Sequence, residues 1–173
     1  MMYPFLSAIL PVLDPAAVPE LTTEEFDLLA REAVGEKLFS RLISGDDPET
    51  EVAVYQDLQH FKAYLDYRIA VIRAEKLRIS SEFPEPEEFF GEIDSALAQA
   101  VSAAPAEREH LLDAILWRKL DDLEICHEMD FEHLCVYRCK LLLLQKYINR
   151  SESAGKSNFE AALEKLAAGF NEP

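Results

Sequence analysis

The sequence predicts an all-α protein built as a helical bundle, with two long amphipathic helices and several shorter ones. Glycine accounts for only 5 of the 173 residues, whereas the strong helix formers Ala, Leu, Glu and Lys are abundant. No segment shows the sustained period of two that marks a half-buried strand. Because 49% of the residues are hydrophobic, the chain can bury a full core, and its composition is not that of a disordered protein.

Three short segments are expected before the first long helix, at residues 3–13, 23–34 and 38–43. The first is apolar with a proline near each end, so it forms either a short helix or an extended arm, and its apolar side needs a partner. The second begins at Thr22 and Glu25, which have the spacing of a capping box. A glycine separates it from the third.

The two long helices are expected over residues 49–79 and about 106–149. Pro105 suits the first turn of the second helix. The stretch Leu116–Tyr147 contains neither Gly nor Pro, so a helix can continue through it, with a kink expected near Asp121–Asp130, where acids are dense. In the first long helix, apolar residues recur at spacings of three and four: Val54, Leu58, Phe61, Leu65, Ile69 and Ile72.

Two shorter helices complete the expected fold. One covers residues 86–101, after a break that contains two prolines. The last follows a second capping box, at Ser157 and Glu160, and carries Phe159, Leu163 and Leu166 on one face.

A chain of this length predicts a single domain over residues 1–173, with 1–80 and 81–173 as candidate sub-units. Residues 64–77 and 128–141 carry a related pattern, which indicates either an internal duplication or two unrelated core helices. The matched positions, 64 residues apart, are Asp66 with Asp130, Lys76 with Lys140 and Leu77 with Leu141.

The formal net charge is −16, from 17 basic and 33 acidic residues. A field of that sign repels nucleic acid and anionic lipid, so we expect neither as a direct ligand. A basic protein partner would suit the chain, and a surface that serves solubility alone is the alternative.

The N-terminal segment has no basic residue before its apolar run, and prolines interrupt that run, so no secretory signal is expected. No stretch approaches the roughly 18 apolar residues of a membrane span. We therefore expect a cytoplasmic protein with no direct membrane insertion and with three reduced cysteines.

Three groups of residues occur together in this chain: Tyr3, Phe5, Leu6, Ala8, Leu10 and Pro11; Tyr64, Leu65, Asp66, Tyr67, Arg73 and Lys76; and Trp117 to Leu123, His127, Asp130, Phe131, Glu132, Lys140 and Leu141. In these residues the chain resembles a bacterial family of unknown function whose genes accompany V-type ATPase genes. The best segment is 116–147, and the resemblance covers most of the chain.

The family is distantly similar to the helical C-type subunit of V/A-type ATPases, which lies between the ring of membrane subunits and the central stalk and has no catalytic chemistry. The resemblance implies a non-catalytic accessory, assembly or stalk-associated component that binds V-type ATPase subunits, and so lies peripheral to the inner face of the membrane. It implies no cofactor. The residues expected to contact a partner or to lock helices together are Asp66, Lys76, Trp117, Arg118, Asp121, Asp130 and Lys140.

Two other functions stay open from the residues alone. Glu124 and His127 have the Glu-x-x-His spacing of di-iron bundles, and with Cys135 and Cys139 they are the candidate ligands of a metal-binding bundle, which could be an oxidoreductase. Helix cysteines are more often small buried hydrophobes. A small acidic chaperone would fit the charge. No phosphate loop, nucleophile elbow or zinc-protease motif is present, so no catalytic residue is expected.

Overall fold

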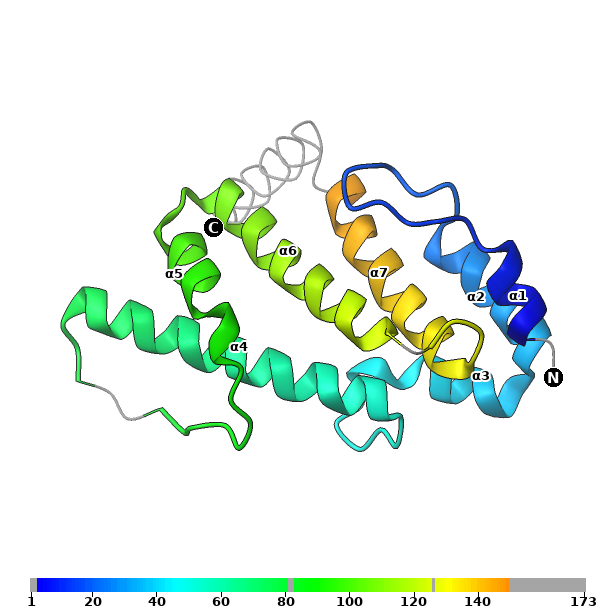
Figure 1. The fold of residues 1–173 in the computed structure, drawn as a ribbon, viewed down its shortest axis with the longest axis horizontal. Helices are drawn as coiled ribbons and strands as arrows, with labels where there is room; N and C mark the ends of the chain where they lie inside the picture. Colours follow the sequence, from blue (N-terminus) through cyan, green and yellow to red (C-terminus); the bar gives the residue numbers. More distant parts are fainter. Residues whose placement is uncertain (1–2, 81–82, 126, 150–173) are drawn as a thin grey trace, which may run out of the picture.

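The computed structural model describes residues 3–80, 83–125 and 127–149. Over these ranges the chain is helical, with no strand, which confirms the predicted all-α fold (Figure 1). The expected last helix lies outside the described residues. In chain order the helices are α1 (Tyr3–Ile9), α2 (Thr23–Val34), α3 (Glu36–Leu42), α4 (Ala53–Leu77), α5 (Asp94–Ser102), α6 (Pro105–Glu124) and α7 (Phe131–Asn149), with the 3-10 turns η1 (Ser44–Asp46) and η2 (Gly91–Ile93).

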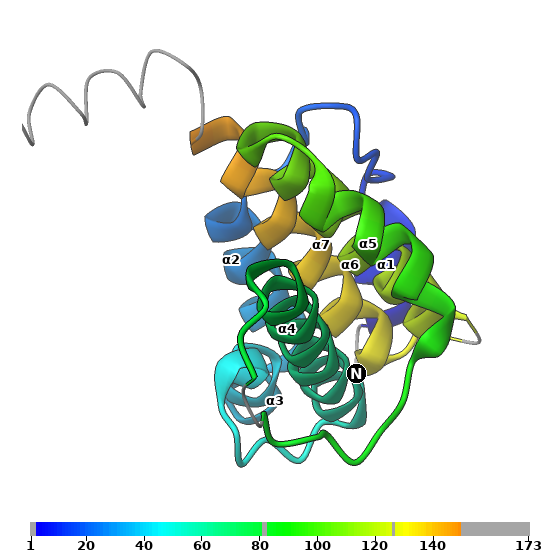
Figure 2. The same ribbon diagram turned by 90° about the vertical axis from the view of Figure 1, so that its left-hand side faces the viewer.

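The helices α6 and α7 lie side by side at the centre of the bundle (Figure 1). The long helix α4 crosses beneath them, and Figure 2 shows it nearly end-on. Helix α5 packs against α4 and α6 at one end, whereas α1 and α2 pack against α7 at the other. Among the described residues, no helix combines the length and the apolar content needed to cross a membrane.

The larger of two buried clusters joins α7 to the N-terminal helices. Phe26 of α2 is fully buried, and its ring lies 5.2 Å from that of Tyr137, between ring centroids. The hydroxyl of Tyr55 on α4 donates a hydrogen bond to the carbonyl of Leu42, which fastens α3 to α4. Burial of large apolar side chains at about 25 cal/mol per Å² is the main stabilising term in such a cluster.

The smaller cluster lies where α4, α5 and α6 meet, and Leu116 packs against both clusters. Phe61 and Phe90 pack edge to face with ring centroids 5.2 Å apart. Beside them, Arg68 of α4 donates two hydrogen bonds to Asp94 at the start of α5, at 2.9 and 3.0 Å. A bidentate pair of this kind fixes the angle between the two helices as well as their separation.

The capping box at α2 is present as predicted. The Thr22 hydroxyl accepts a hydrogen bond from the Glu25 amide at 3.2 Å, and the Glu25 carboxylate accepts one from the Thr22 amide at 2.9 Å. These contacts lower the pKa of Glu25. The helix therefore begins where the sequence places it.

The single helix expected over residues 106–149 is wrong, because the chain forms two helices that are separated between Glu124 and Phe131. The break falls in the acidic stretch where a kink was expected. Asp130 accepts a hydrogen bond from the His133 amide at 3.0 Å, and so acts as the N-cap of α7. A capping aspartate can start a new helix without help from Gly or Pro, and this one lets α7 fold back along α6.

The helix expected over residues 86–101 begins later, at Asp94. Phe89 and Phe90, which precede it, instead pack edge to face on Tyr64 of α4, at 5.6 Å between ring centroids. These ring contacts leave Phe89 77% exposed and Phe90 half-buried, and they hold the segment in an irregular conformation in place of the expected first turns of the helix. The first long helix is also shorter than the expected 49–79 and ends at Leu77, where Arg78 adopts a left-handed conformation.

Two adjacent leucines of α7 test this packing. Leu141 is 1% exposed, whereas Leu142 is 38% exposed. We expect Leu141→Ala to lower the free energy of unfolding by about 2–5 kcal/mol, because it leaves a cavity in the larger cluster. The matched Leu142→Ala should cost clearly less. Urea denaturation of both variants checks this, and equal losses would contradict the described register of α7.

Candidate functional site

Several polar residues of segment 116–147 meet where α6 and α7 face each other. Lys140 of α7 is only 7% exposed. Its Nζ lies 2.7 Å from Asp121 Oδ1 and 2.5 Å from Glu124 Oε2, and both acids belong to the last turns of α6. The ammonium also lies 5.5 Å from the centre of the Trp117 ring, within the range of a cation–π contact. Three predicted residues are thus brought together as a lock between two helices.

Glu124 is bound from two sides by α7. While Oε2 meets Lys140, Oε1 lies 3.0 Å from His133 Nδ1. Contact with His133, together with Lys140, holds the pKa of Glu124 at about 2, although burial acts to raise it. Because the carboxylate stays ionised, it balances the charge of the buried lysine. The sequence did not predict that His133 pairs with Glu124, since a contact over nine residues depends on how the chain turns between the helices.

A small cavity of about 220 Å³ adjoins this cluster. The segment that follows α1 closes one side of it, and the hydroxyl of Tyr137 donates a hydrogen bond to the carbonyl of Pro11 at 2.9 Å. The side chains at its wall include both polar and apolar groups: Ser7, Leu10, Pro11, Val12, Leu13, Glu124, His133, Tyr137 and Lys140.

Asp130 holds the turn between α6 and α7 rather than contacting Lys140. Its Oδ2 lies 2.6 Å from His127 Nδ1, while its Oδ1 caps α7. Hydrogen bonds from His127 and from the His133 amide lower its pKa against the raising effect of burial. Within the described part of the chain, His127, Asp130 and Glu132 are the one group of three potential metal ligands whose ligand atoms lie within 4.8 Å of one another.

The four candidate ligands Glu124, His127, Cys135 and Cys139 do not form such a group in the described ranges. Glu124 is bound to Lys140 and His133, and His127 to Asp130. Burial raises the pKa of the Cys135 thiol to about 12 and that of Cys139 to about 11. Thiols that hold their protons so firmly are poor nucleophiles at neutral pH.

The remaining predicted residues lie apart from this cluster. The Nζ of Lys76 donates a hydrogen bond to Ser102 at the end of α5, at 3.1 Å, so it helps to join α4 to α5. Asp66 and Arg118 are exposed, and neither makes a hydrogen bond or an ion pair with the described residues. The predicted set therefore divides into residues that lock helices and two that are open to a partner.

The matched positions of the two related segments have different environments. Asp66 is exposed within α4, whereas Asp130 caps α7. Lys76 meets the end of α5, whereas Lys140 is buried against two acids of α6. The sequence pattern is therefore repeated without a repeated set of contacts.

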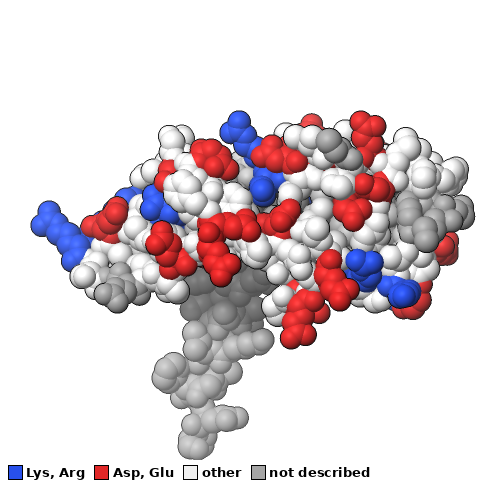
Figure 3. Space-filling view, turned by 60° about the horizontal axis from the view of Figure 1, so that its bottom comes forward, with Lys and Arg blue, Asp and Glu red and all other residues white. Residues whose placement is uncertain are grey.

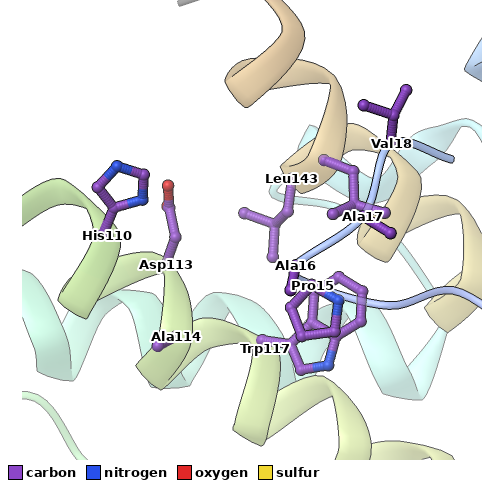
Figure 4. A pocket seen from close by; sticks show the side chains of 10 residues that line it. Pro15, Ala16, Ala17, Val18, His110, Asp113, Ala114, Trp117 and Leu143 are labelled. Atoms are coloured by element: carbon purple, nitrogen blue, oxygen red, sulfur yellow. The ribbon is translucent and has the colours of Figure 1, made fainter.

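A larger hollow of about 490 Å³ opens between α6, α7 and the segment before α2 (Figure 4). His110 and Asp113 project from α6 on one side, and Pro15 to Val18 close the other. Asp113 is buried, and its Oδ1 lies 3.5 Å from the Nζ of Lys146. Of the residues that line this hollow, only Trp117 belongs to the set predicted to contact a partner or to lock helices.

A third hollow, of about 270 Å³, lies on the outer side of α1 and α2, and we call it the α1–α2 groove. It is lined by Phe5, Leu6, Ile9, Leu29, Glu32 and Ala33. Phe5 is 62%, Ile9 53% and Leu29 39% exposed, which is unusual for large apolar side chains that lie together. The sequence signal for it was the apolar stretch 3–13, whose apolar side needs a partner.

Comparison of the chain with models of protein families, with curated proteins and with solved structures gave no match.

Replacing Lys140 tests the lock between α6 and α7. In Lys140→Met, the Glu124 and Asp121 carboxylates lose their shared cation, and we expect the free energy of unfolding to fall by about 1.5–3 kcal/mol, as for other hydrogen bonds to charged groups. Arg118→Met, on the exposed side of α6, should change it by less than about 0.5 kcal/mol. Urea denaturation measures both, and a Lys140→Met variant as stable as the parent would contradict the lock.

The low pKa of Glu124 predicts a dependence of stability on pH. Because the folded pKa of about 2 lies below the ordinary 4.5, ionised Glu124 stabilises the fold above about pH 4.5, and this contribution is lost as the pH falls towards 2. The stability difference between the parent chain and Glu124→Gln should therefore be largest near pH 7 and shrink below pH 4.5.

Urea denaturation at a series of pH values measures this difference. The exposed Glu128, which lies between α6 and α7, supplies the control, since Glu128→Gln should track the parent throughout. A stability difference between the parent chain and Glu124→Gln that stays constant with pH would refute the low pKa assigned to Glu124.

Proposed function

We propose that the chain is a non-catalytic accessory or assembly component of a bacterial V-type ATPase, which binds other subunits through helical surfaces. The choice of complex rests on the resemblance of the segments around Tyr64, Trp117 and Asp130 to proteins encoded with such ATPases. The single observation that carries the mode of action is the uncovered apolar surface of α1 and α2.

The contacts made by polar residues of segment 116–147 support an architectural role for this segment. Lys140 of α7 contacts both Asp121 and Trp117 of α6, and so sets how the two helices pack. Residues that join two helices maintain the shape of the surface those helices form, whereas a catalytic group must face a substrate. Asp66 and Arg118, which are exposed, are the members of the set that could contact a partner directly.

The charge of the chain supports a protein partner with basic surface. Acidic side chains predominate on the face in Figure 3, where basic ones are scattered among them. The sequence pI is about 4.6. Surface charge of one sign speeds the encounter with a partner of the opposite sign and disfavours partners of like charge.

Metal binding is the second candidate function, favoured by the grouping of His127, Asp130 and Glu132. An imidazole and two carboxylates are suitable ligands for several divalent metals. Asp130 already serves as the cap of α7, so a metal there would be coupled to the turn between α6 and α7.

Affinity purification of the tagged full chain from its native host, at low salt, tests the proposal. We expect V-type ATPase subunits, identified by mass spectrometry, to co-purify. Asp66→Asn combined with Arg118→Gln should lower their yield without lowering the melting temperature, because both side chains are exposed. As a matched control, the similarly exposed Glu75→Gln and Arg73→Gln pair should leave the yield unchanged.

Absence of every ATPase subunit from the purified material would contradict the proposal. Metal analysis of the same preparation separates the second candidate, since stoichiometric zinc or iron that disappears in Glu132→Gln would favour metal binding instead.

A further inference from the structure

One wall of the α1–α2 groove is the outer side of the short helix α1. On the inner side of this helix Leu6 is buried, and Leu10 and Leu13 of the segment that follows pack with it against the larger cluster. Phe5 and Ile9, four residues apart and therefore on one side of α1, line the groove and remain exposed. The inner side of α1 is thus covered by the fold, whereas its outer side presents two large apolar side chains to solvent.

The second wall of the groove comes from α2. Leu29 and Ala33 are four residues apart and line the hollow together with Glu32. Glu25, four residues before Leu29, lies on the same side of the helix. Both acids are exposed. The groove therefore has an apolar floor and an acidic margin along α2.

No cation neutralises this margin within the described part of the two helices. Helix α1 carries no charged residue, and the sequence contains no Lys or Arg before Arg31. Arg31 is engaged elsewhere: its Nε lies 3.3 Å from Glu36, and its guanidinium lies 4.5 Å from the centre of the Phe39 ring. The uncompensated charge of the groove is negative.

The size of the groove fits a helix better than a small molecule. Its volume of about 270 Å³ is below the typical range of ligand pockets, about 300–1,000 Å³. It has room for one or two apolar anchors, while the exposed side chains beside it extend the contact along the helix axis. Peptides that bind in this way place anchors at i, i+3, i+4 and i+7.

We propose that the α1–α2 groove binds a basic amphipathic helix of a partner protein, with apolar anchors against Phe5, Ile9 and Leu29 and with Lys or Arg facing Glu25 and Glu32. The inference deepens the proposed function, because it assigns the chemistry of the partner to the surface on which that function rests. A second copy of this chain is a poorer occupant, since it would bring a second acidic margin against the first.

The test uses the full chain and a fluorescent synthetic helix of roughly 18 residues, about five turns, with Leu on one face and Lys on the other. We expect saturable binding by fluorescence anisotropy at about 0.15 M salt. A matched peptide with Glu in place of Lys should not bind, and one with Ser in place of Leu should bind at least about tenfold more weakly, the loss expected when a buried anchor is removed.

Variants of the chain locate the site. Ile9→Gln and Leu29→Gln should each weaken binding of the Leu/Lys peptide by about tenfold. Leu77→Gln, on the exposed end of α4, should change it by less than about twofold. Glu32→Gln should weaken it at low salt and lose this effect as salt rises, whereas Glu75→Gln on α4 should not. Circular dichroism confirms that each variant folds.

Three outcomes overturn the inference: equal binding of the acidic peptide, groove variants that bind as the parent does, or equal losses in Leu77→Gln. Concentration-dependent dimerisation that Ile9→Gln abolishes would replace the partner helix by a second copy. Failure of the proposed function is distinguishable, because the Leu/Lys peptide can bind the groove even if no ATPase subunit co-purifies. Conversely, ATPase subunits that co-purify undiminished with Leu29→Gln would uphold the function and refute this site.

Discussion

The buried ammonium of Lys140 is the constraint on which the packing of α6 and α7 depends. A charge removed from water costs several kcal/mol unless partners replace its hydration. Asp121 and Glu124, three residues apart, supply those partners from one side of α6. Because both carboxylates must reach the same nitrogen, the two helices are held in one register, and a shift of one residue would turn the acids away. Aliphatic packing alone would tolerate such a shift more easily.

Helices α1 and α2 are attached to α7, so the position of α7 determines where they lie. Arg138, two residues before Lys140, donates hydrogen bonds to both oxygens of Asp27 on α2, at 2.8 and 3.0 Å. Tyr137 holds the segment after α1 through the carbonyl of Pro11, and the hydroxyl of Thr23 donates to Gln145 at 2.7 Å. These polar contacts fix the orientation of the helices around the apolar cluster. Helices α1 and α2 are thus fixed against α7 on their inner side, while their outer side stays uncovered.

Local features of the fold were predictable from the sequence. The start of α2 follows from the spacing of Thr22 and Glu25, because a capping box acts over three residues. The break before α7 was less visible, since Asp130 acts as a cap only if the chain turns there, and an aspartate inside an acidic helix has the same sequence signature. The late start of α5 depends on Phe89 and Phe90 reaching Tyr64 across the bundle, a contact that no periodicity encodes.

The candidate site, too, could be predicted from the sequence only in part. Trp117, Asp121 and Lys140 were singled out together, but their grouping in space, and the part that His133 plays beside Glu124, depend on how α7 returns along α6. Asp66 and Asp130 occupy matched positions in the sequence pattern, yet one is exposed and the other caps a helix. A residue pattern fixes which face of a helix a side chain occupies, whereas its partner is fixed by the angle at which the next helix arrives.

The apolar groove depends on this rigid attachment. An exposed apolar stripe on a loosely held helix would have to be ordered on binding, and each immobilised segment would subtract from the affinity. Here Leu6 is buried, and Tyr137 ties down the chain just beyond α1, so Phe5 and Ile9 are already held in place. The apolar area then supplies affinity, while the acidic margin at Glu25 and Glu32 accelerates encounters with basic helices and disfavours acidic ones. A surface that was only acidic would bind any cationic partner. A surface that was only apolar would bind any helix with an exposed apolar face. The two together restrict the partner to a helix whose apolar face is flanked by basic side chains.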